Sequence, residues 1–152
     1  MIHIVSYKDE YKEYIKSLNY EWLEKYFAVE ENDIKQLSNP QTEILDKGGK
    51  IFFALDGNTV VATASLLKVN DEEYELAKMA VTEKYKSAGI GKMLMDYCIA
   101  EAIKLNAKKL SLFSNTKLSA AIHVYKKYGF VEIPLPEDAH YIRSNIMMEK
   151  LL

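Results

Sequence analysis

A glycine turn that joins a strand to a helix constrains this chain most. Residues 84–92 read Lys-Tyr-Lys-Ser-Ala-Gly-Ile-Gly-Lys. They follow a predicted strand, Tyr74–Val81, and open a helix that apolar spacing predicts over Ile90–Leu105. Gly89 and Gly91 remove side chains where backbone N–H groups face outward, and a helix N-terminus offers unpaired donors and a positive dipole end. The segment therefore predicts a phosphate-binding turn.

Two common phosphate-binding motifs do not fit this turn. A P-loop requires Gly-x-x-x-x-Gly-Lys-Ser/Thr, but Gly91 and Lys92 are followed by Met93. A dinucleotide fingerprint that starts at Gly89 needs its third glycine where this chain has Leu94. Both alternatives are therefore disfavoured.

The elements around the turn predict a mixed sheet. Ile51–Leu55 and Thr59–Val69 are rich in β-branched and aromatic residues and flank Asp56-Gly57-Asn58, which indicates a hairpin. Strands are expected at Ile2–Val5, Ile51–Leu55, Thr59–Val69, Tyr74–Val81, Lys109–Ser114, Phe130–Ile133 and Ile142–Leu151, and helices near 8–27, 33–37, 42–46, 90–105 and 118–128. This order predicts an α/β (α+β) fold with a mixed, mostly antiparallel central sheet of six to seven strands flanked by helices. The length, 152 residues, suits a single domain over 1–152.

Two motifs in order resemble those of one family. Residues 86–91, Lys-Ser-Ala-Gly-Ile-Gly, resemble the Gln/Arg-x-x-Gly-x-Gly/Ala motif of the GNAT superfamily of acyl-CoA-dependent N-acyltransferases. Residues 121–130, Ala-Ile-His-Val-Tyr-Lys-Lys-Tyr-Gly-Phe, resemble the second motif of that family, Ala-x-x-x-Tyr-x-x-x-Gly-Phe. Lys86 departs from the usual Gln or Arg, because it keeps a positive charge but lacks the planar fork of Arg. The order of elements over the whole chain also fits the GNAT fold.

The resemblance implies a cleft for acetyl-CoA, the acyl donor of the family. Backbone groups of Met79 and Val81 would pair with the pantetheine arm like an added strand, on a strand splayed open by a bulge. Amides of the glycine turn would hold the pyrophosphate. The implied cofactor-binding residues are Met79, Ala80, Val81, Lys86, Ser87, Ala88, Gly89, Ile90, Gly91, Lys92 and Asn115. For Asn115, at a strand end, a role as a helix-entry residue is an equal alternative.

Two side chains are candidates for proton transfer. The resemblance places Tyr125 near the sulfur, and a phenol with a pKa of about 10 suits protonation of the departing thiolate. The alternative is that Tyr125 simply ends the apolar face of its helix. Glu75 is the candidate base for the attacking amine, and strict alternation would place it on one face with Met79 and Val81. The alternative is an ordinary strand-end carboxylate near Lys78.

The acceptor side is expected in residues 18–50 and the 134–145 loop. Candidate substrate-binding residues are Glu21, Trp22, Tyr26 and Phe27, to which Glu30 and Glu31 add acidic charge. Such an acidic, aromatic cluster suits a substrate that carries an ammonium group. The alternative is a helix that packs its aromatic residues on the sheet and leaves its acids in solvent. Arg143 and Asn145 are alternative partners for a substrate carboxylate.

The charge and composition narrow the class of partner. The chain has 20 basic and 22 acidic residues, a net charge of −2, which argues against a nucleic-acid partner. The acids gather in residues 1–46, whereas 107–131 holds five lysines and no acid.

Cys98 is the single cysteine and lies in a helical apolar pattern, so we expect a core residue and a reducing compartment. No apolar run approaches the length of a membrane span, no leader is visible, and no ligand spacing indicates a metal site. We expect a cytoplasmic protein with no membrane partner.

The functional hypothesis is an N-acetyltransferase that moves an acetyl group from acetyl-CoA directly to a primary amine. The amine is a small molecule, a peptide N-terminus or a lysine, and the protein is a monomer or a homodimer. One alternative is a non-catalytic acyl-CoA-binding sensor module. A second is an interaction protein that uses the aromatic N-terminal surface, and the glycine turn argues against it.

Overall fold

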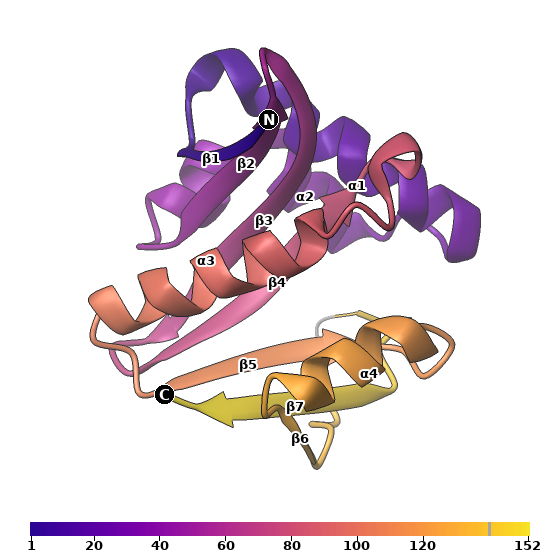
Figure 1. Ribbon diagram of the computed structural model, residues 1–152. Helices are drawn as coiled ribbons and strands as arrows, with labels where there is room; N and C mark the ends of the chain where they lie inside the picture. Colours follow the sequence, from indigo (N-terminus) through magenta and orange to yellow (C-terminus); the bar gives the residue numbers. More distant parts are fainter. Residues whose placement is uncertain (140) are drawn as a thin grey trace.

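A computed structural model describes residues 1–139 and 141–152, so His140 of the predicted 134–145 loop lies outside the described residues. The described chain forms a seven-stranded sheet in the order β1-β2-β3-β4-β5-β7-β6 (Figure 1). The strands are β1 (Ile2–Ser6), β2 (Lys50–Asp56), β3 (Thr59–Asn70), β4 (Glu73–Val81), β5 (Lys109–Ser114), β6 (Val131–Ile133) and β7 (Ile146–Leu151). The helices are α1 (Lys12–Tyr26), α2 (Glu31–Ser38), α3 (Ile90–Lys104) and α4 (Ser119–Lys127), with single turns η1 (Asp9–Tyr11), η2 (Gln41–Leu45) and η3 (Glu83–Tyr85). The expected fold class is confirmed.

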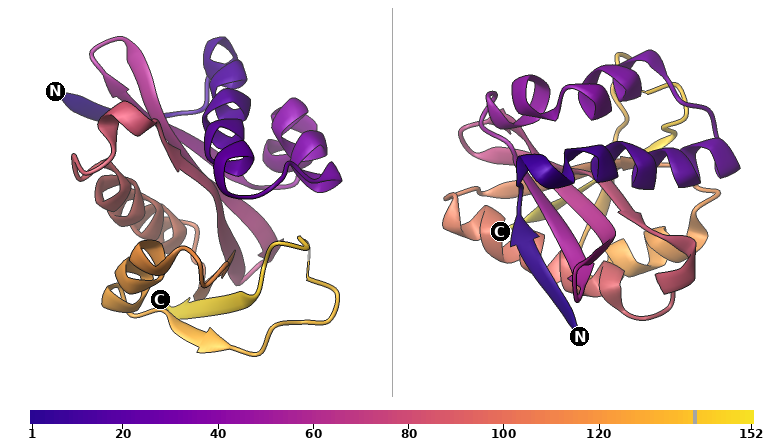
Figure 2. Two further views of the ribbon diagram at one scale, coloured as in Figure 1. Left: turned by 90° about the vertical axis from the view of Figure 1, so that its right-hand side faces the viewer. Right: turned by 90° about the horizontal axis from the view of Figure 1, so that it is seen from above.

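The helices cover both faces of the sheet. Helices α1 and α2 lie on one face, and α3 and α4 lie on the other (Figure 2). Among the described strands only the β4–β5 pair is parallel. Parallel neighbours need a crossover connection, and α3 provides it. The glycine turn therefore lies at the carboxyl end of β4, where the crossover begins.

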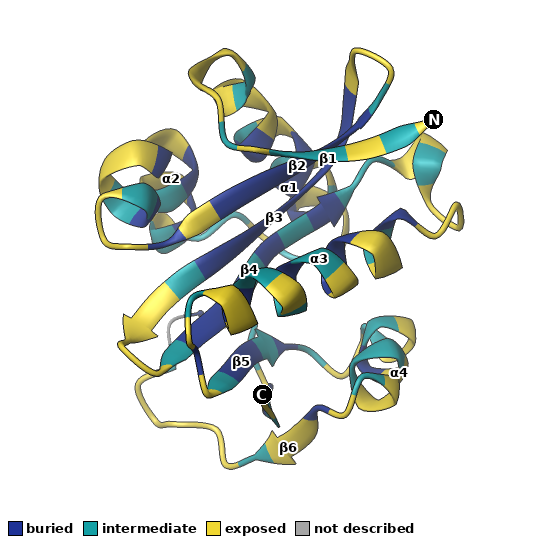
Figure 3. Cartoon of the chain, turned by 60° about the vertical axis from the view of Figure 1, so that its left-hand side comes forward, coloured by how far each residue is buried: buried dark blue, intermediate teal, exposed yellow. Residues whose placement is uncertain are grey.

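The central strands are buried on both faces, which explains their near-continuous apolar sequence. Residues 51–55 and 60–66 are all buried (Figure 3). On the α1–α2 side Ile15, Leu23 and Phe53 are at most 1% exposed. Each such side chain contributes about 1.5–3 kcal/mol through the area it removes from water.

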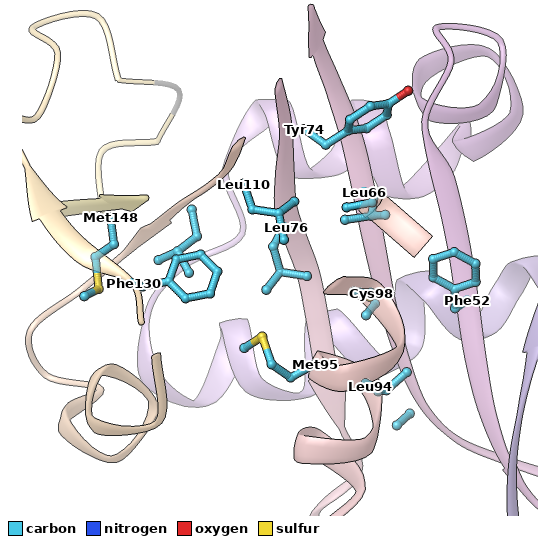
Figure 4. Close-up of a cluster of buried hydrophobic side chains, with 14 of the residues drawn as sticks. Phe52, Leu66, Tyr74, Leu76, Leu94, Met95, Cys98, Leu110, Phe130 and Met148 are labelled. Carbon is cyan, nitrogen blue, oxygen red and sulfur yellow. The ribbon is translucent and has the colours of Figure 1, made fainter. Parts of the chain in front are cut away.

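The second core cluster lies between the sheet and α3. Leu94, Met95 and Cys98 of α3 pack against Phe52 and Leu66 of the strands (Figure 4). Cys98 is fully buried as predicted, and burial raises the pKa of its thiol to about 12. This thiol is therefore a core group and not a nucleophile.

Strand β4 contains a β-bulge at Lys78. Thr63 of β3 pairs with Ala80, but Ser65 pairs with Ala77, so β4 has one extra residue over this span. Lys78 itself has a φ of +53°, in the left-handed region. A bulge of this kind breaks the alternation of side chains and bends the strand.

The bulge makes the predicted alternation along β4 wrong. Met79 and Val81 pack against the core cluster on the α3 side. Lys78 contacts Asp33 of α2 on the opposite face, and Glu75 borders α2 on that same face. Glu75 therefore does not share a face with Met79 and Val81.

Strands β4 and β5 separate after a short parallel contact. They pair only from Glu73–Glu75 to Lys109–Ser111, and β5 then continues along β7 (Figure 1). The sheet therefore opens into a V between β4 and β5.

The predicted strand over Ile142–Leu151 begins only at Ile146, because residues 142–143 are bonded to α2 and to Glu30 before it. In the described residues no helix is both long and apolar enough to cross a membrane.

Candidate active site

A cavity of about 640 Å³ fills the V between β4 and β5. Its walls are the end of α1, the bulged half of β4, the glycine turn, the end of β5, α4 and the loop before β7. The predicted residues that line it are Glu75, Met79, Ala80, Val81, Lys86, Ser87, Gly89, Ile90, Gly91, Lys92, Asn115, Tyr125, Trp22, Tyr26 and Phe27. Glu21 and Ala88 are not among the lining residues. The fold thus brings most of the predicted site together.

The glycine turn points a set of free amides toward the cavity. Ser87 and Gly89 have φ values of +71° and +80°, which turn successive N–H groups the same way. The amides of Ser87, Gly89 and residues 90–92 have no hydrogen-bond acceptor within the described chain. A Cβ added at Gly91 would meet no atom within 4 Å. This arrangement is a nest of amides at a helix N-terminus, a geometry that can hold an anion.

Contacts from α1 and β2 hold the turn in place. Glu21 accepts hydrogen bonds from the Glu83 amide at 2.8 Å and from the Thr82 hydroxyl at 3.1 Å. Tyr85 donates to Asp56 at 2.8 Å. Glu21 was predicted to bind substrate, but its carboxylate is instead bonded to the segment that leads into the turn.

Lys86 stands beside the free amides. Its ammonium pairs with Glu83 at 3.0 Å and lies 5.6 Å from the centre of the Tyr26 ring. The Lys86 side chain is 39% exposed, so this pair exchanges readily with water and ions. Lys86 can therefore turn toward an anion in the nest without leaving a buried charge unpaired.

Asn19 of α1 supports the bulge in β4. Its side chain is fully buried and donates to the carbonyl of Ile15 at 2.8 Å and to that of Lys78 at 3.3 Å. Its oxygen accepts from the Trp22 indole at 3.3 Å. Asn19 was not predicted, although an Asn among the apolar positions of a helix is a signal that such a role leaves in a sequence.

Aromatic side chains form the wall on the α1 side. The rings of Trp22 and Phe27 meet edge to face with their centres 6.1 Å apart. Lys117, in the turn after β5, lies 5.8 Å from the centre of the Phe27 ring. These contacts hold the aromatic rings of this wall.

Tyr125 projects from α4 into the cavity. Its ring packs edge to face on Phe130, with 6.0 Å between centres. Its hydroxyl makes no hydrogen bond with any described residue. Burial raises the pKa of this phenol, so it stays protonated at neutral pH. Tyr125 is therefore a free proton donor on the cavity wall.

Asn115 closes the turn after β5. Its amide group donates to the carbonyl of Arg143 at 2.7 Å, and its oxygen accepts from the Lys117 amide at 2.8 Å. The second contact is the turn geometry expected of a residue that leads into a helix. Asn115 also lines the cavity, so its predicted cofactor contact stays a prediction.

Glu75 is a buried carboxyl with no partner. It is 5% exposed and makes no hydrogen bond or ion pair with the described residues. Burial raises its pKa to about 7, and the charge of Lys78 opposes this shift while that of Glu73 adds to it. Such a group can both hold and release a proton at neutral pH.

A buried ion network lies beside Glu75. Asp33 is fully buried and accepts from Lys78 at 3.0 Å and from Arg143 at 2.7 and 2.8 Å. Burial alone would raise the pKa of Asp33, but these bonds, with the Glu30 amide, lower it. Burial lowers the pKa of Lys78, and Asp33 opposes that shift. Asp33 and Lys78 were not predicted, since the contact joins residues 45 positions apart.

Two further residues complete this network. Tyr141 accepts from Lys78 at 2.6 Å and donates to Gln36 at 2.6 Å. Glu30 accepts from the amides of Ile142 and Arg143 at 2.8 and 3.1 Å. Glu30 was expected to add charge for an ammonium substrate, but its carboxylate is already bonded to the loop. No group of three metal-ligating side chains occurs in residues 1–139 and 141–152.

The splayed sheet and the amide-lined turn define the class of fold. Comparison of the chain with known protein families identifies this class. The chain matches the model of the Acetyltransferase (GNAT) family over residues 8–130. Because this match covers more than half of the chain, the protein belongs to the GNAT acetyltransferase family.

Individual relatives agree with this assignment. An uncharacterized N-acetyltransferase of Bacillus subtilis strain 168, YvbK, is 28% identical over 101 residues, which cover 64% of this chain and 65% of that protein. The match thus spans less than two thirds of the relative. A GNAT acetyltransferase from Staphylococcus aureus Mu50 superposes with a TM-score of 0.89 at 25% identity, over 99% of each chain. A spermidine N-acetyltransferase from Vibrio cholerae, solved with CoA and spermine, gives a TM-score of 0.74 at 18% identity over 99% of this chain and 95% of that one.

We expect Asp33→Asn to destabilise the protein by about 3–5 kcal/mol, because it leaves Lys78 and Arg143 buried without their shared carboxylate. Denaturant unfolding followed by circular dichroism measures this change. The matched control is Glu24→Gln on α1, an exposed carboxylate, with a change within about 0.5 kcal/mol. An Asp33→Asn protein as stable as the control would show that the network does not hold the fold together.

Proposed function

We propose that this protein transfers an acetyl group from acetyl-CoA directly to a primary amine. The observation that carries the proposal is the nest of free amides at Ser87 and residues 89–92, which opens onto the same cavity as Tyr125 and Glu75. An anion site, a proton donor and a proton acceptor in one cavity are the groups that acyl transfer to an amine requires. Membership of the GNAT family and the CoA bound to the Vibrio cholerae structure support the choice of donor.

The donor would bind along the inner edge of β4. After Glu75 this edge has no strand partner on the β5 side, and the bulge at Lys78 turns it into the cavity. An extended pantetheine arm beside Met79–Val81 would take the place of the missing strand. The amides of residues 87–92 would receive the pyrophosphate, with Lys86 and Lys92 adding charge.

The reaction needs two proton movements, and the cavity offers one group for each. Glu75 would take a proton from the substrate ammonium, so that the neutral amine attacks the thioester carbonyl. The C–N bond forms, the C–S bond breaks, and Tyr125 would give its proton to the departing thiolate. Glu75 and Tyr125 are both free of hydrogen bonds within the described chain, which favours this enzyme over a non-catalytic acyl-CoA sensor.

Replacement of Gly91 by Ala tests the anion site. We expect the affinity for acetyl-CoA to fall about tenfold or more, because the new methyl group would stand among the free amides. The melting temperature should stay the same or rise, since the site is open and Ala favours a helix over Gly by about 1 kcal/mol. Calorimetric titration with acetyl-CoA measures the affinity. Met93→Ala, exposed and outside the cavity lining, is the control, and equal affinity of the two variants would refute the site.

The pH dependence tests Glu75. Because the base must be deprotonated, kcat/KM should rise as pH increases through about 7 and then level off. Glu75→Gln should remove this rise and lower the plateau by about 10²–10⁴-fold. Glu73→Gln, on the same strand and paired with Lys109 in the native protein, should keep the profile. A Glu75→Gln enzyme with the native profile would assign the base elsewhere.

Replacement of Tyr125 by Phe removes only the hydroxyl oxygen and so tests the role of Tyr125 as the acid. Tyr125→Phe should lower kcat by about 10²-fold, with an unchanged dissociation constant for acetyl-CoA, because the ring still packs on Phe130. Tyr128→Phe is a matched control on the same α4 end, where the hydroxyl donates to Asp96 at 2.8 Å outside the cavity lining. Release of the CoA thiol gives the rate. If Tyr125→Phe and Tyr128→Phe turn over alike, Tyr125 is not the acid.

A further inference from the structure

A second cavity, of about 380 Å³, lies on the α2 side of β4. It is bounded by α2, η2 and the end of β3. Glu75 and Tyr141 line both this cavity and the one between β4 and β5. These two side chains therefore border both the proposed donor site and a second space of the size that holds a small molecule.

Glu75 places a buried carboxyl group at one end of this second cavity. The carboxyl is 5% exposed and has no hydrogen-bond partner in the described part of the chain. Tyr141 beside it is 7% exposed and is held by Lys78 and Gln36. An unpartnered buried carboxyl is costly, and an amine that enters the cavity would satisfy it.

The solvent-exposed part of the cavity is positively charged, which is opposite in sign to an ionised Glu75. Lys35, Lys47 and Lys68 line it, and Glu43 is the acid among them. Glu43 is shared between Lys35 at 3.4 Å and Lys47 at 3.5 Å, so one carboxylate serves two ammonium groups. Lys68 pairs at 3.2 Å with Asp71, which is 96% exposed and lies outside the cavity lining. The mouth therefore has an excess of positive charge.

We propose that this cavity binds the acceptor, a small primary amine that carries an anionic group at its far end. The amine lies at Glu75, and the carboxylate or phosphate lies among Lys35, Lys47 and Lys68. The acceptor thus reaches the thioester from the α2 side, and the donor occupies the cavity between β4 and β5. This inference rests on the proposed function and adds the class of substrate to it.

The charge of the mouth opposes a polyamine substrate. A polyamine would place its distal ammonium groups among the lysines, where like charges repel. The Vibrio cholerae spermidine N-acetyltransferase is 18% identical to this chain, and a likeness at that level shows the fold alone. The two substrate classes therefore make opposite predictions for the same assay.

The test compares acceptors that differ only at the far end. Aminohexanoate, pentylamine and diaminopentane share an amine on a chain of five saturated carbons. The fifth carbon carries a carboxylate in the first, a hydrogen atom in the second and an ammonium group in the third. With saturating acetyl-CoA, kcat/KM for aminohexanoate should exceed that for pentylamine by about fivefold or more, and diaminopentane should be the poorest. Aminopentyl phosphate shows whether phosphate or carboxylate is preferred. A higher kcat/KM for diaminopentane or pentylamine overturns the proposal.

A paired substitution tests the lysines. Lys47→Gln with Lys68→Gln should lower the ratio of kcat/KM for aminohexanoate to kcat/KM for pentylamine to about one, and Lys35 still neutralises Glu43 in this variant. Lys104→Gln, 76% exposed on α3 and outside both cavity linings, is the control. An unchanged preference in the paired variant overturns the proposal.

A binding measurement separates this inference from the proposed function. Aminohexanoate is titrated calorimetrically into the native and paired-variant proteins in the presence of CoA. Binding that depends on the lysines, without acetylation, supports the cavity as an amine site and refutes acetyl transfer to such amines. Acetylation of pentylamine without any binding of aminohexanoate supports the transferase and refutes the anionic acceptor.

Discussion

The rest of the site depends on the ion pairs that the buried carboxylate of Asp33 makes with Lys78 and Arg143. It joins α2 to Lys78 of β4 and to Arg143 of the loop before β7. An unpaired buried charge is costly, so these three elements stay together or the charges become exposed to water. The network holds the bulge that turns the edge of β4 into the cavity, and it keeps residues 142–143 out of β7. The network therefore stabilises both the bulge in β4 and the position of the loop before β7.

Two carboxyl groups on the same side of the sheet have opposite environments. Asp33 receives bonds from two cations, and its pKa is lowered. Glu75 is buried without a hydrogen-bond or ion-pair partner among residues 1–139 and 141–152, and burial raises its pKa to about 7. A difference of this kind separates a structural charge from a group that exchanges a proton. Glu75 also lines both cavities, whereas Asp33 lines only the cavity between β4 and β5.

Local signals in the sequence predicted the elements well. The hairpin at residues 56–58, the glycine turn and the two amphipathic helices depend on neighbours within a few positions, and the structure has them where expected. Long-range contacts explain the errors. Strict alternation failed at Lys78, because a bulge held by Asp33 leaves no periodic signal. Glu21 was expected to bind substrate and Glu30 to add acidic charge beside it, but each carboxylate accepts a hydrogen bond from a backbone amide more than 60 residues away.

The sequence by itself determined the order of the strands and helices, the glycine turn between a strand and a helix at residues 84–92 and the resemblance to the GNAT family. These properties depend on residue type and short spacing. Only the tertiary structure decided that the carboxyl of Asp33 is paired while that of Glu75 has no partner among the described residues. It also decided where β4 separates from β5 and that Glu75 lines two cavities. Burial and pairing are properties of the folded chain, since they depend on which distant side chains meet and on how much water is excluded between them.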